Sequence, residues 1–397
     1  MILSTEKKNN VLKDLAMLIE DHASSIIEAN KLDLEKAGDL DPTLVDRLKV
    51  DDKKVKGMVG SVAEVLGLED PEGKVLSAYE HPNGMTVENR VVPFGRILII
   101  YESRPDVTIE AAVSAFKSGN KILLKGGKEA RNSNLVLVDL WKKALKSNDV
   151  SEDYVEYLDI DRAATQKMLS ENTYQLDLII PRGGEGLINY IKQTTNVPLM
   201  ISGRGNNFIY IHKDVDLDMA IDIVLNGKSR LSVCNAIDKV LFDQEIPQLA
   251  DKVAQLAQKA IDFGLEVLGD DQVTSFTTLA QKADVDELMP EEFLSEKILF
   301  TVTPDKASAV NTINKYSGGH SAVIISNDKE IATAFQYEVD CAAVYHNASS
   351  RFTDGGQFGF GAEIAISTQK LHFRGPVGLA QLVSNKWFIS GNGQTRN

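Results

Sequence analysis

Residues 176–186 read Leu-Asp-Leu-Ile-Ile-Pro-Arg-Gly-Gly-Glu-Gly, a short apolar run that leads directly into a glycine-rich turn. A continuous apolar run of this kind is typical of a buried parallel strand. A helix-like segment follows at residues 187–193, and glycines before a helix allow its N–H groups to approach an anion. The turn departs from G-x-G-x-x-G, so a plain strand-to-helix turn explains it as well as a dinucleotide site does.

Two more apolar runs precede this stretch, at residues 96–101 and 121–125, and helical spacing marks residues 108–117 and 133–145. The resulting strand-helix alternation predicts an open parallel sheet with helices on both faces. A second glycine-rich loop, Lys125-Gly-Gly-Lys128, ends one of these runs. Because ligands bind beyond the carboxyl ends of such strands, two glycine loops at one edge favour a nucleotide cofactor.

The rest of the chain predicts a second wound lobe and a small β element. Apolar helical spacing at residues 11–29 and 55–66 predicts two packing helices near the N-terminus. A hairpin is expected at residues 73–90, paired either within the chain or with a neighbouring subunit. The second lobe is expected to contain strands at residues 240–242, 297–302 and 322–325, with helices at 248–263 and 304–316.

Composition limits the function. The 397 residues suit two lobes, and 43 basic against 57 acidic residues leave a net charge of -14, which argues against nucleic acid and favours a small-molecule partner. Two isolated cysteines and the absence of metal-ligand spacing predict neither disulfides nor a metal site. No run of about 18 apolar residues suggests a membrane span, so a cytoplasmic protein is expected.

Cys234 lies in Lys228-Ser-Arg-Leu-Ser-Val-Cys-Asn-Ala236, just before a strand-like run. A lone cysteine is more often a small buried packing residue than a nucleophile. The nearby Lys228 and Arg230 would favour the thiolate, so Cys234 is the candidate nucleophile. The other cysteine, Cys341, lies in an apolar run and is assigned to packing. A cysteine hydrolase is a distant alternative, because no histidine matches a cysteine-protease pattern.

Five longer motifs resemble one family over nearly the whole chain. The motifs are Ile100-Tyr-Glu-Ser-Arg-Pro-Asp-Val-Thr108, Leu124-Lys-Gly-Gly-Lys-Glu-Ala130, Cys234-Asn-Ala236, Asn347-Ala-Ser-Ser-Arg-Phe-Thr-Asp-Gly-Gly356 and Gly361-Ala-Glu-Ile-Ala-Ile-Ser-Thr-Gln-Lys-Leu-His372. On these motifs the chain is similar to the gamma-glutamyl phosphate reductases, also called glutamate-5-semialdehyde dehydrogenases, of the aldehyde dehydrogenase superfamily.

The resemblance implies an α/β, aldehyde dehydrogenase-like fold with two wound lobes and a small β oligomerisation element. The expected cofactor-binding domain comprises residues 1–72 and 92–230, and the catalytic domain residues 231–373. The hairpin and tail, residues 73–91 and 374–397, would make the oligomerisation element of a homodimer or a dimer of dimers.

The resemblance also implies a reaction. The enzyme would use NADPH to reduce L-glutamate 5-phosphate to L-glutamate 5-semialdehyde, with release of phosphate, as a step of proline biosynthesis. Cys234 would form a thioacyl intermediate during this reaction.

Individual roles follow from matched motif positions. Lys125 matches the lysine on the adenosine ribose, and Glu292 matches the glutamate on the nicotinamide ribose. The substrate anions would be held by Arg104 and Arg351, whose forks suit phosphate and carboxylate, and by His320. Each arginine could equally form a structural ion pair. The remaining cofactor-binding candidates are Lys128 for a 2'-phosphate, with Arg182, Gly183 and Gly184 near the pyrophosphate.

Four departures from the family pattern surround the expected catalytic site. Asp106 stands where the family has Asn and where the superfamily forms its oxyanion hole; an ionised carboxylate cannot donate there, so Asn235 is an alternative donor. The family's Cys-His pair is Asn207-Phe208 here, and its Arg-Pro is Arg230-Leu231, in a loop that is one residue shorter. These changes leave open an altered member that binds cofactor or substrate without efficient turnover.

Overall fold

The computed structural model describes residues 3–38, 40–361 and 363–396, so Met1, Ile2, Asp39, Ala362 and Asn397 of the expected domains and motifs lie outside the described residues. The chain divides into two compact units. The first comprises Met1–Ile201, Gly359–Ala365 and Pro376–Asn397, and the second Ser202–Phe358 and Ile366–Gly375.

The first unit begins with helices. The expected helix at residues 11–29 is in fact two, because the backbone turns at His22, whose N–H and ring Nδ1 both contact the Leu18 carbonyl. The apolar face of the first helix is buried, including Val11, Leu15 and Ile19. The helices are α1 (Thr5–Asp21), α2 (Ala23–Glu35), α3 (Pro42–Leu48) and α4 (Asp52–Gly67).

A four-stranded parallel sheet forms the centre of this unit, in the order β5-β4-β3-β6. The strands expected from the three apolar runs are all present, which confirms the wound fold. Apolar side chains on one face pack with α1, α4, α5 and α6, and those on the other with α7 and α8. The strands are β3 (Arg96–Tyr101), β4 (Lys121–Gly126), β5 (Val155–Tyr157) and β6 (Leu178–Arg182); the helices are α5 (Val107–Lys117), α6 (Arg131–Ser147), α7 (Arg162–Glu171) and α8 (Glu185–Thr194), with short 3-10 turns η1 (Lys128–Ala130) and η2 (Glu152–Tyr154).

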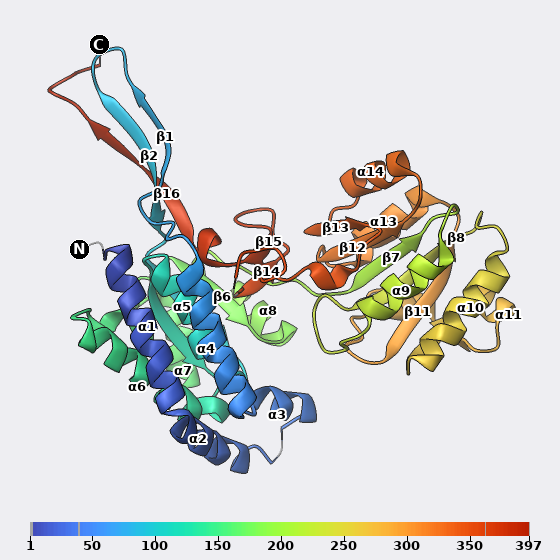
Figure 1. Ribbon diagram of the computed structural model, residues 1–397, viewed down its shortest axis with the longest axis horizontal. Coiled ribbons are helices and arrows are strands. Elements are labelled where there is room, and N and C mark those ends of the chain that lie inside the picture. Colours follow the sequence, from blue (N-terminus) through green and yellow to red (C-terminus); the bar gives the residue numbers. More distant parts are fainter. Residues whose placement is uncertain (1–2, 39, 362, 397) are drawn as a thin grey trace. The chain divides into compact units, whose positions relative to one another are not determined.

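The second unit is built on a seven-stranded parallel sheet, in the order β10-β9-β11-β8-β7-β12-β13 (Figure 1). Its apolar faces pack with α9 and α10 on one side and with α13 and α14 on the other. The strands are β7 (Asn207–Ile211), β8 (Ile237–Asp243), β9 (Glu266–Gly269), β10 (Gln281–Lys282), β11 (Lys297–Thr303), β12 (Ser321–Ile325) and β13 (Ala343–His346). The helices are α9 (Leu217–Gly227), α10 (Leu249–Asp262), α11 (Asp271–Phe276), α12 (Val285–Leu288), α13 (Lys306–Tyr316) and α14 (Lys329–Glu338).

One strand explains where the units divide. β7 pairs with both β8 and β12, so residues 202–230, expected in the cofactor-binding domain, lie in the second unit. Residues 207–211 were not predicted to form a strand. Strand pairing between distant segments, rather than local composition, places this segment.

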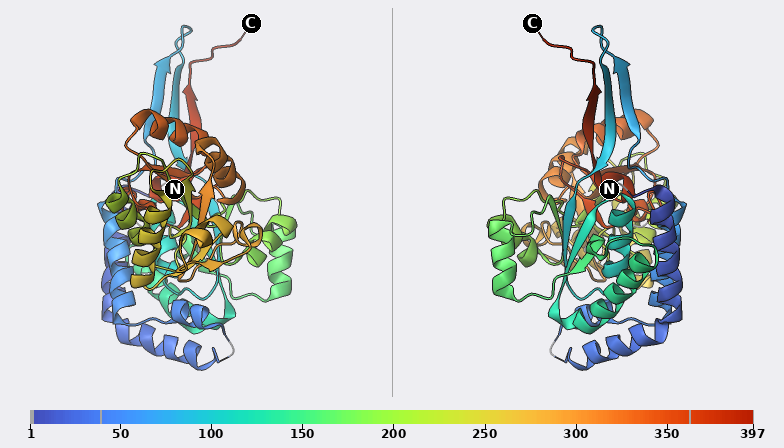
Figure 2. Two further views of the ribbon diagram at one scale, coloured as in Figure 1. Left: turned by 90° about the vertical axis from the view of Figure 1, so that its right-hand side faces the viewer. Right: turned by 90° about the vertical axis from the view of Figure 1, so that its left-hand side faces the viewer.

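The predicted hairpin is confirmed, and its partner is the C-terminal strand of the same chain. β1 (Val75–Glu80) pairs antiparallel with β2 (Thr86–Pro93), and β2 pairs antiparallel with β16 (Val383–Ser390). The three strands run side by side in both views of Figure 2. Short strands β14 (Ala365–Ser367) and β15 (Gly375–Val377) and turns η3 (Ser350–Phe352) and η4 (Leu379–Gln381) complete the described elements.

Among the described residues, none of the helices combines the length and apolar character needed to cross a bilayer.

Candidate active site

Both glycine loops of the first unit lie at the carboxyl edge of its sheet. Tyr101 at the end of β3 pairs with Gly126 of β4 and with Arg182 of β6. The strands are parallel, so Lys125, Arg182 and the segments that follow them meet at one edge, as the sequence predicts.

The loop before α8 already holds an anionic oxygen. The Gly184 N–H donates to the Glu102 carboxylate over 3.0 Å. A Cβ at Gly183 would lie 2.4 Å from the same oxygen, so a side chain at this position would displace the Glu102 carboxylate. The partial positive charge of a helix N-terminus favours an anion here. A pyrophosphate fits this loop if its oxygens replace the exposed Glu102 side chain.

Two amines stand beside this loop edge. Lys125 is half-buried and donates to the Gly126 carbonyl over 3.1 Å. Burial lowers the pKa of Lys125, and the carboxylates of Asp159 and Glu129 oppose that shift. Lys128, in η1, is exposed. Such amines suit ribose hydroxyls and a phosphate.

Asp106 is engaged in ion pairs at the start of α5. Its side chain is 7% exposed, and its oxygens lie 3.1 Å from Arg104 Nη2 and 4.0 Å from Lys54 Nζ. Burial raises the pKa of nearby Glu110, and the charge of Asp106 adds to that shift. An ion-paired carboxylate accepts hydrogen bonds and has no proton to donate. In this arrangement Asp106 is not an oxyanion-hole donor, and Arg104 is partly occupied by a structural ion pair.

Cys234 is half-buried and lies just before β8. Gly205 packs against it so closely that a Cβ at position 205 would lie 1.8 Å from the Cys234 carbonyl oxygen. Asn207 begins β7 and Ser321 begins β12. The cysteine loop therefore lies at the amino edge of its parallel sheet.

Asn235 and Arg351 are brought together beside the cysteine. The Asn235 amide donates to the carbonyls of Thr353 (3.0 Å) and Arg351 (3.3 Å), and its oxygen contacts Arg351 Nη1. Burial lowers the pKa of the Arg351 guanidinium, as does Arg230, whereas Asp354 and Cys234 raise it. Arg351 is therefore a cation within electrostatic range of the thiol, and Asn235 anchors the segment that carries it.

Glu292 is connected to the same loop. It accepts a hydrogen bond from the Gly205 N–H over 2.9 Å, and burial raises its pKa while that hydrogen bond opposes the shift. This contact places the predicted nicotinamide-ribose ligand and the candidate nucleophile on either side of one glycine.

Two lysines, Lys228 and Lys239, are buried near the segment that contains Glu292. Lys228 forms an ion pair with Asp238 over 2.6 Å. Its charge is therefore neutralised by Asp238, whereas its place in the sequence suggested that it would stabilise the Cys234 thiolate. Lys239 donates to the Glu291 carbonyl (2.7 Å) and lies 3.6 Å from the centre of the Phe293 ring. Burial lowers the pKa of Lys239 to about 7. Lys239 was not among the predicted site residues, because a lysine inside a strand has no local signature.

His320 and Cys341 are enclosed. The His320 side chain is fully buried; its Nδ1 lies 2.9 Å from Ser321 Oγ, and its Nε2 has no hydrogen-bond partner among the described residues. Burial lowers its pKa to about 4. The ring is thus placed to support the start of β12, and a substrate-binding role for it stays a prediction. Cys341 is buried in an apolar cluster, as predicted, and burial raises its pKa to about 11.

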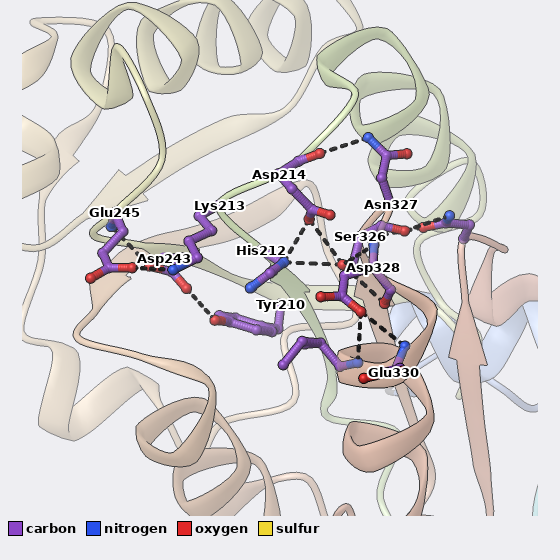
Figure 3. A network of polar contacts seen from close by, with 12 residues as sticks. Tyr210, His212, Lys213, Asp214, Asp243, Glu245, Ser326, Asn327, Asp328 and Glu330 are labelled. Atoms are coloured by element: carbon purple, nitrogen blue, oxygen red, sulfur yellow. Dashed lines mark hydrogen bonds and ion pairs between the residues drawn. The ribbon is translucent and has the colours of Figure 1, made fainter.

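The carboxyl edge of the second sheet carries a polar network instead (Figure 3). His212 Nδ1 lies 2.6 Å from Asp214 Oδ1 and 3.0 Å from Ser326 Oγ, and the Tyr210 hydroxyl donates to Asp243. His212 is buried directly after the end of β7. A catalytic triad uses opposite ring nitrogens for Ser and Asp, so this network joins strand ends and is no nucleophilic site.

Within the described ranges, no group of three or more His, Cys, Asp or Glu side chains is arranged to hold a metal ion.

Comparisons with known proteins agree on the family. The aldehyde dehydrogenase family model matches residues 2–298. Gamma-glutamyl phosphate reductases from Desulforamulus reducens and Clostridium perfringens are 41% and 42% identical, over 100% and 99% of this chain and 95% of each relative.

Solved structures agree as well. The crystal structure of gamma-glutamyl phosphate reductase from Thermotoga maritima superposes with a TM-score of 0.94 at 39% identity, covering 100% of this chain and 95% of that one. An acetylating aldehyde dehydrogenase from Geobacillus thermoglucosidasius, 14% identical with a TM-score of 0.70 over 100% of this chain and 94% of its own, shares the fold. With this likeness over its full length, the chain belongs to the gamma-glutamyl phosphate reductases of the aldehyde dehydrogenase family.

Proposed function

We propose that this chain reduces L-glutamate 5-phosphate to L-glutamate 5-semialdehyde and phosphate with NADPH, using Cys234 as the nucleophile. The observation that carries the proposal is the full-length similarity to gamma-glutamyl phosphate reductases. The surroundings of Cys234 support it, because Cys234 interacts electrostatically with Arg351 and its backbone packs against Gly205, whose N–H donates to Glu292.

The chemistry divides into two halves. The Cys234 thiolate attacks the acyl carbon, the carbon–oxygen bond to phosphate breaks, and phosphate leaves with its electron pair. When bound, the nicotinamide cofactor would supply the hydride that reduces the resulting thioester. The carbon–sulfur bond of the thiohemiacetal then breaks, which releases the aldehyde and regenerates the thiolate. A guanidinium such as that of Arg351 stabilises the negative charge that develops on the substrate.

We assign six residues to the cofactor. Lys125, Lys128 and Arg182 would hold the adenosine phosphates and ribose, with the Gly183-Gly184 turn facing the pyrophosphate. Glu292 would accept hydrogen bonds from the nicotinamide ribose. The anionic oxygen already bound by the Gly184 N–H supports this assignment.

We also propose that the three-stranded sheet makes subunit contacts in a homodimer or a dimer of dimers. Tyr79, Val87 and Ile389 pair across the sheet, and Trp387 lies two residues before Ile389. Side chains at alternate positions share a face, so these residues line one side. Tyr79 is 54% exposed, Trp387 51% and Ile389 60%. Large apolar side chains gathered on one face are typical of an interface.

The test is a phosphate-dependent assay in the reverse direction. Purified protein given pyrroline-5-carboxylate, phosphate and NADP+ should form NADPH, and the rate with NAD+ in parallel measures cofactor preference. Cys234→Ala is expected to abolish the activity because no other group can form the thioester. The matched control is Cys341→Ala, a buried cysteine outside the site, which should retain turnover. An unchanged rate in Cys234→Ala would disprove the assignment.

A second candidate is a member that binds cofactor or substrate with little turnover. It is favoured by Asp106, whose ion-paired carboxylate supplies no donor, and by Asn235, whose amide already donates to the Thr353 carbonyl. Calorimetry that detects NADPH binding, together with no turnover of acyl phosphates or aldehydes, would support this candidate.

A further inference from the structure

Asn207, one of the departures from the family pattern, has an unusual set of partners. Its side chain is fully buried at the start of β7. The amide nitrogen donates to three carbonyls, those of Gly205 (2.8 Å), Cys234 (2.7 Å) and Ala236 (2.6 Å). The amide oxygen accepts the Ser321 N–H over 3.0 Å. One side chain thus connects the cysteine loop to β7 and to the start of β12.

The backbone explains why a side chain is needed here. The β7–β8 pairing shifts register between Asn207 and Phe208, and pairing with β8 begins at Ile237. The carbonyls of Cys234 and Ala236 precede that strand, and a buried carbonyl without a donor is costly. The Asn207 amide donates to these two carbonyls, because the regular hydrogen bonding between β7 and β8 has not yet begun there. An amide has two hydrogens, so at least one is shared between carbonyls.

The Cys234 carbonyl, which accepts a hydrogen bond from Asn207, is also in close contact with Gly205. Gly205 lies against the Cys234 carbonyl so closely that any side chain at 205 would overlap it. The Gly205 N–H donates to Glu292, and the Gly205 carbonyl accepts from Asn207. Glu292, Gly205, Asn207 and Cys234 therefore form one continuous chain of hydrogen bonds and packing within the second unit.

We propose that Asn207 is the positioning residue that holds the Cys234 loop in register with Glu292, so that the thiol faces the bound substrate and cofactor in one geometry. The proposal rests on the proposed function for its kinetic consequence only. Phe208, which together with Asn207 replaces the family's Cys-His pair, is fully buried in the apolar core. Asn207 therefore provides hydrogen bonds at this position, and Phe208 provides apolar packing.

Asn206 provides a matched control. It is also fully buried, and its amide donates to the carbonyls of Met289 (2.8 Å) and Tyr316 (2.9 Å), away from the cysteine loop. Asn207→Ser and Asn206→Ser each remove one buried amide at neighbouring positions. A general loss of stability would appear in both variants, whereas a loss of cysteine positioning would appear only in the first.

The first measurement is hydrogen–deuterium exchange of the peptide that contains residues 233–237. We expect exchange there to rise about tenfold or more in Asn207→Ser, because the carbonyls on both sides of the loop lose their donor. Asn206→Ser should keep the wild-type rate in this peptide. Equal exchange of the peptide in the two variants would overturn the proposal, and this result does not depend on any activity.

The second measurement is steady-state turnover in the phosphate-dependent assay. Misplacing a nucleophile lowers kcat more than it weakens ground-state binding. We expect kcat to fall about 10- to 100-fold in Asn207→Ser, with KM for pyrroline-5-carboxylate nearly unchanged. A wild-type kcat in Asn207→Ser would contradict the positioning role. Absence of turnover in the wild-type protein would refute the proposed function instead, and the exchange experiment would still decide the role of Asn207.

Discussion

At the scale of single residues, Asp106 shows how one atom changes a site. An Asn has a donor that an ionised Asp lacks, and the family resemblance assigns this position to the oxyanion hole. In this chain the carboxylate is paired with Arg104 and Lys54. At the position that the resemblance assigns to the oxyanion hole, Asp106 would therefore lack a donor and would add a negative charge that opposes the developing oxyanion.

Asp106→Asn is accordingly expected to increase activity. One oxyanion donor changes kcat by about 10²- to 10³-fold in other enzymes, so we expect a gain of about tenfold or more in kcat, with KM little changed. Asp106→Ala removes the charge without adding a donor and should gain less. Initial rates of both variants in the phosphate-dependent assay make the comparison. No gain in either variant would show that the carboxylate does not face the reacting carbonyl.

His320 determines part of the pH dependence of stability. Burial lowers its pKa from 6.5 to about 4 in the folded protein. The unfolded chain therefore binds the proton first as the pH falls, so the stabilisation present above pH 6.5 is lost between pH 6.5 and 4. The shift corresponds to a loss of roughly 3 kcal/mol.

His320→Asn should remove that part of the pH dependence. Urea unfolding at pH 7, 6, 5 and 4 should show the free energy of unfolding of the wild type falling more steeply than that of the variant. Parallel curves for the two proteins would mean that the ring becomes protonated in the folded state without penalty.

At the scale of elements, the three-stranded sheet differs from the two wound sheets because both of its faces carry exposed side chains. One face displays Tyr79, Trp387 and Ile389, and the other carries Lys386 and Ser390, placed by the same alternation. Strand β16 of the same chain pairs with one edge of the hairpin. The face that carries Tyr79, Trp387 and Ile389 is exposed and is therefore available for the proposed subunit contact.

Replacing that face should dissociate the oligomer. Trp387→Ser combined with Ile389→Asp removes two large apolar side chains and adds a charge to the proposed interface. The matched control is Lys386→Ser with Ser390→Asp, on the opposite face of the same strand. Light scattering coupled to size-exclusion chromatography should report a lower mass for the first pair only. A monomeric wild type, or an unchanged mass in both pairs, would contradict the proposed interface.

At the scale of the whole molecule, local patterns predicted three strands of each wound sheet. The apolar runs at residues 96–101, 121–125 and 176–180 correspond to β3, β4 and β6, and the hairpin follows its Pro-Asn-Gly turn. These features are contiguous in the chain, so periodicity and turn residues reveal them. The break at His22 was missed because the backbone turns there within a continuous helical pattern. The strand β7 was missed because it is defined by pairing with a distant segment.

The sequence alone determined the fold class, the family and the candidate nucleophile, since each depends on a run of neighbouring residues. Only the tertiary structure placed Cys234 at the amino edge of its sheet, between Gly205 and Asn207. It also paired Asp106 with Arg104 and Lys54, and it buried Lys239 against the Glu291 carbonyl. The physical reason is that these arrangements join residues far apart in the chain. Buried polar groups must find hydrogen-bond partners wherever packing brings them, and no local pattern encodes that choice.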